Sequence, residues 1–395
     1  MKTERRVILH INTARKYGRG LLTGIGRYAR LRGTWQFYRS LPRYVTAVNR
    51  REEMMRVHDW RPTGGIVWDS ERIGELLSLG IPLVVSPNVV VSKHYRDLFE
   101  AFPQIGSNCE AIGKMGAEYF LDRGFRHFGF CGFRRAPWAQ RRASAFAQRI
   151  AEAGYDTDVF PLRGAPKAKR LQEATDHIVE WIRSLPKPLA VMACNDDRAF
   201  NVVDACRRAG CLIPEEVAVL GVDDEEEACE VFTPPLSSIC LNATMAGFRA
   251  AEVLEAMMTG KTVPQTKWKI PVEPMYVVTR RSTDVMAIED RVVAEAVNYV
   301  EQQVYAPIQV EDVVRKVSLS RRNLELRFRK ALGRSVYAHI RKTKVNRITE
   351  VLLSTQTSIQ EIAKAFGYPD AHNMSRFFKK ETGLSLSEYR RKHRF

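Results

Sequence analysis

The 395-residue sequence has no apolar run of 18 residues or more, so it offers no candidate transmembrane helix. Its seven cysteines form no Cys-x-x-Cys pair and all precede residue 241, and its eight histidines form no His-x-x-x-His pair. We therefore expect reduced thiols buried in cores, without disulfides, a metal site or another cofactor. The opening Met-Lys-Thr-Glu-Arg-Arg leads into a strand and does not read as a signal peptide, which predicts a cytoplasmic protein.

Motifs of common enzyme classes are also missing. No P-loop and no Gly-x-Ser-x-Gly is present, and the glycines at 18, 20, 24 and 26 lack the register of a dinucleotide-binding loop. An enzyme acting on a sugar stays open as an alternative, because paired carboxylates could do acid–base work.

Positive charge is unevenly distributed along the chain. The net charge is +17, and the 105 residues from Arg291 onwards contribute +11 of it, with 21 basic and 10 acidic side chains. A basic surface alone could face DNA, RNA or a membrane. A basic surface on paired recognition helices would indicate DNA binding.

A helical pattern in the basic region occurs twice, offset by 50 residues. Each copy has an N-cap residue, two apolar side chains one turn apart, a cation and a terminating glycine. The two sets are Ser320, Leu324, Phe328, Lys330 and Gly333, and then Asp370, Met374, Phe378, Lys380 and Gly383. The repeat predicts two helix-turn-helix units, at about 310–332 and 359–382, joined by a helix from about 335 to 354, with double-stranded DNA as the partner.

The first 270 residues alternate short apolar runs with helical patterns. The expected strands include Val7–Ile11, Gly65–Trp68, Pro82–Val85, Phe128–Cys131, Ala190–Ala193 and Val217–Leu220, and the expected helices include Gly20–Arg30, Gly113–Arg123, Arg142–Ala153 and Asp197–Ala209. This alternation predicts an α/β fold of parallel sheets with helices on both faces, which binds ligands beyond the carboxyl ends of the strands. A polar stretch at 280–284, followed by a helix from near Ile288, suggests domains of residues 1–284 and 285–395.

The last hundred residues resemble the DNA-binding domain of the AraC family. The resemblance covers 320–330, 362–370 (Ile-Ala-Lys-Ala-Phe-Gly-Tyr-Pro-Asp), 378–383 (Phe-Lys-Lys-Glu-Thr-Gly) and 388–390, with Met374 and Leu386 as departures. It implies an all-α domain whose DNA-binding positions are Arg321, Arg322, Glu325, Leu326, Arg329, His372, Asn373, Arg376 and Lys379. The alternative for each of these is a solvated helix face or a phosphate contact.

The first 280 residues resemble the sugar-sensing core of the LacI family, which is related to two-lobed periplasmic sugar-binding proteins. The matching stretches are 142–146 (Arg-Ala-Ser-Ala-Phe), 194–196 (Cys-Asn-Asp), 221–224 (Gly-Val-Asp-Asp) and 233–236 (Thr-Pro-Pro-Leu). Carboxylates, amides and arginine suit the hydroxyls of a sugar. The implied sugar-binding residues are Asp69, Arg142, Asp196 and Asp223, followed by Asn12, Arg19, Asn108 and Asn195, each with a helix cap or surface ion pair as its alternative.

The fusion of the two parts resembles the xylose operon regulators. That resemblance implies a bacterial, nucleoid-associated homodimer that binds operator DNA and a pentose, D-xylose first, with RNA polymerase as a further partner. It favours an activator, while the residues leave repression and a different monosaccharide open. A purely structural nucleoid protein is disfavoured, because it would have no use for a sugar-sensing core.

Overall fold

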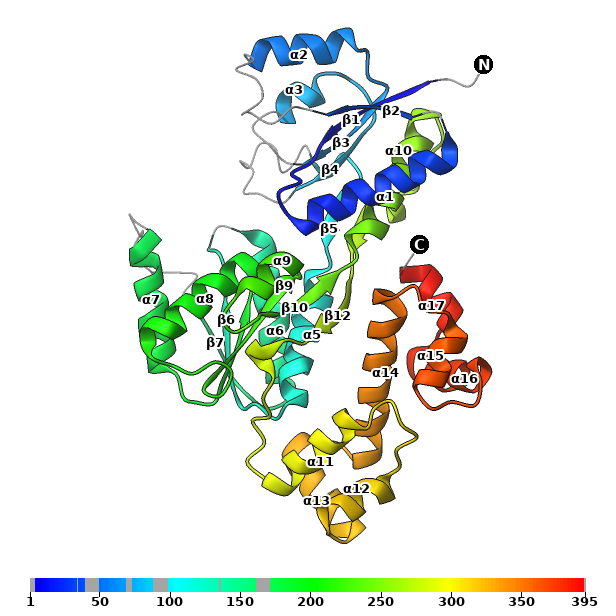
Figure 1. Ribbon diagram of the computed structural model, residues 1–395. Helices are drawn as coiled ribbons and strands as arrows, with labels where there is room; N and C mark the ends of the chain where they lie inside the picture. The colour runs from blue at the N-terminus through cyan, green and yellow to red at the C-terminus, as the bar shows by residue number, and fades with distance from the viewer. Residues whose placement is uncertain are drawn as a thin grey trace. The chain divides into compact units, whose positions relative to one another are not determined.

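The computed structural model describes residues 4–33, 35–39, 50–68, 73–87, 99–134, 136–160 and 171–393. Two six-stranded sheets with their helices precede a helical carboxyl-terminal region (Figure 1). The predicted fold class, α/β lobes followed by an all-α domain with two helix-turn-helix units, is confirmed. Among the described helices none is both long and apolar enough to cross a membrane.

The first sheet has the strand order β11-β5-β4-β3-β1-β2. Its strands are β1 (Arg5–His10), β2 (Trp35–Arg39), β3 (Gly64–Trp68), β4 (Leu83–Ser86), β5 (Gln104–Ser107) and β11 (Lys269–Val272), and its helices are α1 (Lys16–Arg32), α2 (Arg50–Asp59), α3 (Ile73–Leu77), α10 (Ala243–Met258) and the short η1 (Gln265–Lys267). Helices α1 and α10 pack closely, since a Cβ on Gly247 would lie 2.1 Å from the Leu21 carbonyl oxygen. The side chains of Ile8, Val67 and Val85 form the centre of this lobe's core.

The second sheet has the strand order β12-β10-β9-β8-β6-β7. Its strands are β6 (His127–Cys131), β7 (Thr157–Val159), β8 (Leu189–Ala193), β9 (Val217–Asp223), β10 (Ser237–Leu241) and β12 (Pro274–Val278), and its helices are α5 (Cys109–Asp122), α6 (Pro137–Ala151), α7 (Leu171–Ser184), α8 (Asp196–Ala209) and α9 (Glu226–Val231). Val191, Val219 and Ile182 lie in its core. All seven cysteines lie in the described part of the chain as thiols, and six of them are buried.

Both sheets repeat the same winding. In each, the first strand lies between the second and third, so the chain reverses direction across the sheet between β1 and β3 and again between β6 and β8. Ligands of open α/β sheets bind at such switch points, beyond the carboxyl ends of the strands. The topology therefore directs attention to the loops after β1, β3, β6 and β8.

The helical region consists of two small cores that share one helix. The first contains α11 (Arg291–Gln302), α12 (Val310–Val317) and α13 (Arg321–Leu332), and the second contains α15 (Ile359–Ala365), α16 (Ala371–Thr382) and α17 (Leu386–His393). The shared helix is α14 (Val336–Ser354), which contributes Ile340 to one core and Ile348 to the other. Two helix-turn-helix units joined by one helix are thus confirmed.

The repeated pattern in these units has the predicted structural roles. Ser320 and Asp370 accept hydrogen bonds from the backbone N–H groups three residues on, as N-caps. Gly333 and Gly383 end the helices in the left-handed conformation, with φ of 67° and 79°. Leu324, Phe328, Met374 and Phe378 are fully buried. The caps and glycines thus set where α13 and α16 begin and end, and the buried apolar pairs set which face of each helix is exposed.

The junction with the helical region differs in one detail from the sequence prediction. Before it, the chain passes at Glu273 from β11 in the first sheet to β12 in the second. The helix expected from near Ile288 begins at Arg291 instead. Asp290 caps it by accepting from the Val292 and Val293 N–H groups at 3.0 and 3.2 Å, while Ile288 packs into the first helical core.

Candidate functional site

Four of the predicted sugar-binding residues lie at the carboxyl edge of the second sheet. Arg142 comes from α6, Asn195 and Asp196 follow β8, and Asp223 ends β9. This edge includes the switch point between β6 and β8. The structure thus gathers the second-lobe set where the topology predicts a ligand.

Arg142 is fixed at this edge despite its charge. Its side chain is 3% exposed, and Nη1 donates a hydrogen bond to the carbonyl oxygen of Cys194, just beyond β8. A buried guanidinium at a sheet edge is well placed to donate to sugar hydroxyls, because its other N–H groups have fixed directions.

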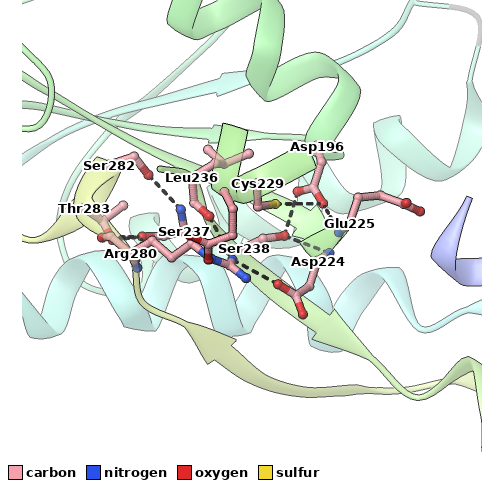
Figure 2. Close-up of polar contacts among 11 residues, drawn as sticks. Asp196, Asp224, Glu225, Cys229, Leu236, Ser237, Ser238, Arg280, Ser282 and Thr283 are labelled. Atoms are coloured by element: carbon pink, nitrogen blue, oxygen red, sulfur yellow. Dashed lines mark hydrogen bonds and ion pairs between the residues drawn. The ribbon is translucent and has the colours of Figure 1, made fainter. Parts of the chain in front are cut away.

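Asp196 faces inward and organises the loop after β9. Its Oδ1 accepts from the Ser238 hydroxyl at 2.6 Å, and its Oδ2 accepts from the Glu225 N–H at 2.8 Å (Figure 2). Burial, and then the charge of Asp223, raise the pKa of Asp196 to about 8. Asp196 is therefore a largely protonated group near neutral pH that holds the β9–α9 loop in place.

The β9–α9 loop carries two consecutive aspartates in an unusual backbone conformation. Asp223 and Asp224 have φ of 106° and 52°, in the region that side-chain-bearing residues rarely adopt. Such strain persists only where the surroundings enforce it, and it clusters at ligand sites. The Asp224 N–H donates to the Ser238 hydroxyl at 3.0 Å, so the contacts of Asp196 and Ser238 supply that enforcement.

Sequence reasoning chose Asp223 and passed over its neighbour. Asp224 forms an ion pair with Arg280 at 3.0 Å, and both side chains are below a tenth exposed. Arg280 also donates to Glu230 at 2.6 Å and to the Leu236 carbonyl oxygen at 2.9 Å. The doubled aspartate at 223–224 and the doubled arginine at 280–281 were the available signals, but nothing in the sequence pairs them.

Asn195 has the capping role that was its alternative reading. Its side-chain oxygen accepts from the Arg198 N–H at 3.0 Å and so caps α8. A sugar contact through its amide group stays a prediction.

The first-lobe residues are placed in local turns and contacts. Asn12 accepts from the Ala14 N–H at 2.9 Å, Arg19 donates to the Ala14 carbonyl oxygen at 3.2 Å, and Asn108 donates to Glu273 at 2.8 Å. Asp69 lies outside the described residues. Sugar contacts by this set stay predictions.

Helix α13 presents a basic outer face. Arg322 and Arg329 are exposed and Leu326 is 62% exposed, opposite the buried Leu324 and Phe328. Arg321 is exposed too, with an ion pair to Glu311 at 2.5 Å. Glu325 accepts from the Val336 N–H at 3.4 Å, which ties it to the start of α14. The exposed face is therefore available to DNA, although Arg321 and Glu325 also make contacts within the protein.

Helix α16 repeats this arrangement. His372, Arg376 and Lys379 are exposed opposite the buried Met374 and Phe378. Asn373 donates its side-chain amide to Asp370 at 3.0 Å, so it contributes to the N-cap. In the described part of the chain, no group of three or more histidine, cysteine or carboxylate side chains could hold a metal ion.

Comparison with known families matches two separate stretches of the chain. Residues 117–283 match the periplasmic binding protein-like domain, and residues 313–392 match a helix-turn-helix domain. The matches thus cover the second sheet and both helix-turn-helix units.

The chain is also similar to known regulators over its whole length. It is 28% identical over 392 residues to the xylose operon regulatory protein of Escherichia coli K12, covering 98% of this chain and 96% of the relative. It is 29% identical over 310 residues to the protein of the same name from Haemophilus influenzae, covering 77% and 79%. A solved structure of the xylose-binding transcription activator XylR covers 100% of both chains with 27% identity and a TM-score of 0.59.

Proposed function

Because this chain is a sugar-responsive transcription regulator, homologous over its full length to xylose operon regulators, we propose that its effector is a pentose, D-xylose first, and that it activates pentose catabolic genes. The supporting observation is the carboxyl edge of the second sheet, where Arg142 is buried and bonded to the Cys194 carbonyl oxygen and Asp223 has a strained backbone. Charged donors and acceptors that are already fixed lose little entropy on binding a polyol.

The first test is calorimetric titration with D-xylose, L-arabinose, D-ribose and D-glucose. We expect D-xylose to bind most tightly. An absence of binding by all four at millimolar concentrations would remove the pentose assignment. The sugar should be recovered unchanged after long incubation, because we propose that the protein is not an enzyme; a new product in the chromatogram would contradict this.

The second test removes single sugar contacts. Asp223→Ala and Arg142→Ala should each weaken sugar binding by about 1.5–3 kcal/mol, the value of a hydrogen bond to a charged group. Asp176→Ala is the control, because Asp176 is an exposed carboxylate of the same lobe, 3.4 Å from Arg208. Unaltered affinity in folded Asp223 and Arg142 variants would exclude both residues from the site.

We propose that the protein works as a homodimer on operator DNA in the bacterial cytoplasm, with RNA polymerase as a further partner. Phe200 and Val231 on the second lobe are 57% and 82% exposed, and Phe200 contacts Phe232, the residue next to Val231, so they contribute to an exposed apolar patch of the kind that marks partner surfaces. A twofold dimer would present four recognition helices to a two-part operator. Light scattering that gives the mass of a single chain at working concentrations would contradict the dimer.

Sugar can regulate DNA binding only if the sugar affinity differs between two states of the protein. We propose that the sugar favours the state whose helix-turn-helix units bind the operator. Operator titrations with and without D-xylose measure this ratio of affinities directly. Equal operator affinities with and without D-xylose would contradict the proposed sugar response.

A further inference from the structure

The residues that lead into the helical domain are attached to the loop that carries Asp223 and Asp224. Arg280 forms its buried ion pair with Asp224, and its N–H donates to the Ser237 hydroxyl at 2.8 Å (Figure 2). Ser282 is fully buried, accepts from the Ser237 N–H at 2.8 Å and donates to the Val219 carbonyl oxygen at 2.6 Å. A displacement of the β9–α9 loop would therefore strain residues 280–282.

The same stretch is attached to α5. The Thr283 hydroxyl lies 2.6 Å from the Tyr119 hydroxyl and 2.7 Å from that of Ser237. The guanidinium of Arg123 lies 3.7 Å from the centre of the Tyr119 ring, and its Nε donates to the Thr283 carbonyl oxygen at 3.4 Å. Helix α5, the junction and the β9–α9 loop thus form one hydrogen-bonded body.

Helix α5 ends in a carboxylate that contacts the helical domain. Asp122 forms ion pairs with Arg334, just before α14, and with Lys342 within it, the latter at 2.8 Å. Arg334 also donates to the Asp122 carbonyl oxygen at 3.4 Å, and Glu118 lies 3.8 Å from Lys342. Burial would raise the pKa of Asp122, but Lys342 and Arg334 more than offset this and hold it below its usual value. The carboxylate is therefore ionised and well shielded, with its side chain 19% exposed.

The start of α14, which makes this contact, also packs against α13, the first recognition helix. His339, on α14 between the two basic partners of Asp122, is 4% exposed. Its ring packs edge-on against Phe328 of α13 at 5.4 Å. Arg327 of α13 pairs with Asp290, the cap of α11, through two hydrogen bonds of 2.7 Å. The start of α14 and α13 therefore move as one piece.

We propose that Asp122 is a positioning residue that clamps the first helix-turn-helix unit to the second lobe, so that the unit follows this lobe when sugar binds. The inference rests on the proposed sugar response and adds its point of attachment. Without the clamp, the remaining links would be the longer Glu118–Lys342 pair at 3.8 Å and the peptide at 284–290, whose Ala287 N–H donates to the Arg123 carbonyl oxygen, so the unit could reorient more easily. The sugar would then bind as before without changing the affinity for DNA.

The test is Asp122→Asn in the full-length protein, which keeps the shape of the side chain and removes its charge. Sugar affinity is measured by calorimetry with D-xylose, and operator affinity by fluorescence anisotropy with and without D-xylose. We expect the sugar affinity to stay within about twofold of wild type, because Asp122 ends α5 and is not one of the predicted sugar contacts. The sugar-induced ratio of operator affinities should fall towards one. The matched control, Asp176→Asn, removes an exposed charge of the same lobe and should keep the wild-type ratio.

A second measurement does not depend on sugar. Hydrogen exchange at residues 336–342 should be roughly tenfold faster in Asp122→Asn, as expected for the loss of one charge-assisted hydrogen bond. If Asp122→Asn does not fold, Lys342→Gln replaces it, because Arg334 then still holds the carboxylate and a smaller change in the same direction is expected.

The outcomes separate the clamp from the proposed function. If Asp122→Asn folds, binds sugar and keeps the wild-type ratio of operator affinities with and without D-xylose, the clamp is overturned. If wild type itself shows no sugar effect, the proposed sugar response fails, and the hydrogen-exchange result alone decides the clamp. Unchanged exchange at 336–342 in both variants would show that the contact positions nothing.

Discussion

Replacing Asp196 by asparagine removes a titratable group while keeping the shape of the side chain. Both oxygens of Asp196 accept hydrogen bonds, one from the Ser238 hydroxyl and one from the Glu225 N–H. The asparagine oxygen can accept from the Glu225 N–H, and its NH2 group can donate to the Ser238 oxygen. Asp196→Asn therefore imitates the protonated acid, and the comparison isolates the effect of its charge.

The magnitude follows from the pKa. Burial, and then Asp223, raise the pKa of Asp196 to about 8 in the folded protein, against about 3.9 in the unfolded chain. A raised carboxyl pKa means that the folded state holds the proton more tightly. Its contribution to stability is fully present below about pH 4 and is lost as pH rises through about pH 8. At about 1.4 kcal/mol per pH unit, wild type should lose about 3 kcal/mol relative to Asp196→Asn between pH 5 and pH 7.

Native-state hydrogen exchange of the β9 amides, corrected for the intrinsic effect of pH on exchange, measures this difference. It reports the local free energy of opening and does not require a multidomain chain to unfold in one step. Asp196→Ala is the control for shape, because it should lose about 1–3 kcal/mol per unsatisfied buried partner at every pH. Parallel pH profiles for wild type and Asp196→Asn would show that Asp196 stays ionised, and the reasoning from burial would be refuted.

Three further predictions concern the DNA-binding domain. Burial, and then Arg334, lower the pKa of His339 to about 3, so this group's contribution to stability is present above about pH 6.5 and is lost as pH falls. Between pH 6.5 and pH 5 wild type should lose about 2 kcal/mol relative to His339→Leu by hydrogen exchange of α14, and equal losses would contradict this. Arg322→Ala should lose about 1–3 kcal/mol of binding free energy on the operator and relax the preference at one base pair. Arg329→Ala should instead weaken binding to all DNA sequences alike and lower the slope of log affinity against log salt by about one unit. An equal loss on all sequences for Arg322→Ala would mean that α13 is rotated relative to the DNA. Footprinting should show two half-sites of roughly two helical turns each, and protection of about one turn in total would exclude simultaneous use of α13 and α16.

The helical domain was predictable almost to the residue because its signals are local. Caps, apolar pairs and terminal glycines act within one helix, so Ser320, Leu324 and Gly333 already define α13. The six predicted strands were accessible for the same reason, since each is a buried run that is continuous in sequence, but β2, β5, β7 and β10 were not among them. The start of α11 was missed because the side chain of Asp290 serves both as its cap and as the partner of Arg327, 37 residues away.

The candidate sugar site was only partly predictable. The sequence places polar residues after the strands, but it does not say which way their side chains point. Asp196 and Asp223 look alike in sequence, whereas the structure directs Asp196 inward to Ser238 and Glu225. Arg280 was seen as part of a polar boundary, because its partner Asp224 is 56 residues away and only the folded sheet brings them together.

Helix α14 fixes the distance between the two DNA segments that α13 and α16 contact. Its 19 residues correspond to a rod of about 28 Å, and both cores are built on it, so neither unit can slide along it. One base pair inserted between the two contacted segments would turn the second by about 34–36° around the DNA axis. Among the operators that the protein regulates, the number of base pairs between the two contacted segments should therefore be constant, whereas the sequence of those base pairs can vary.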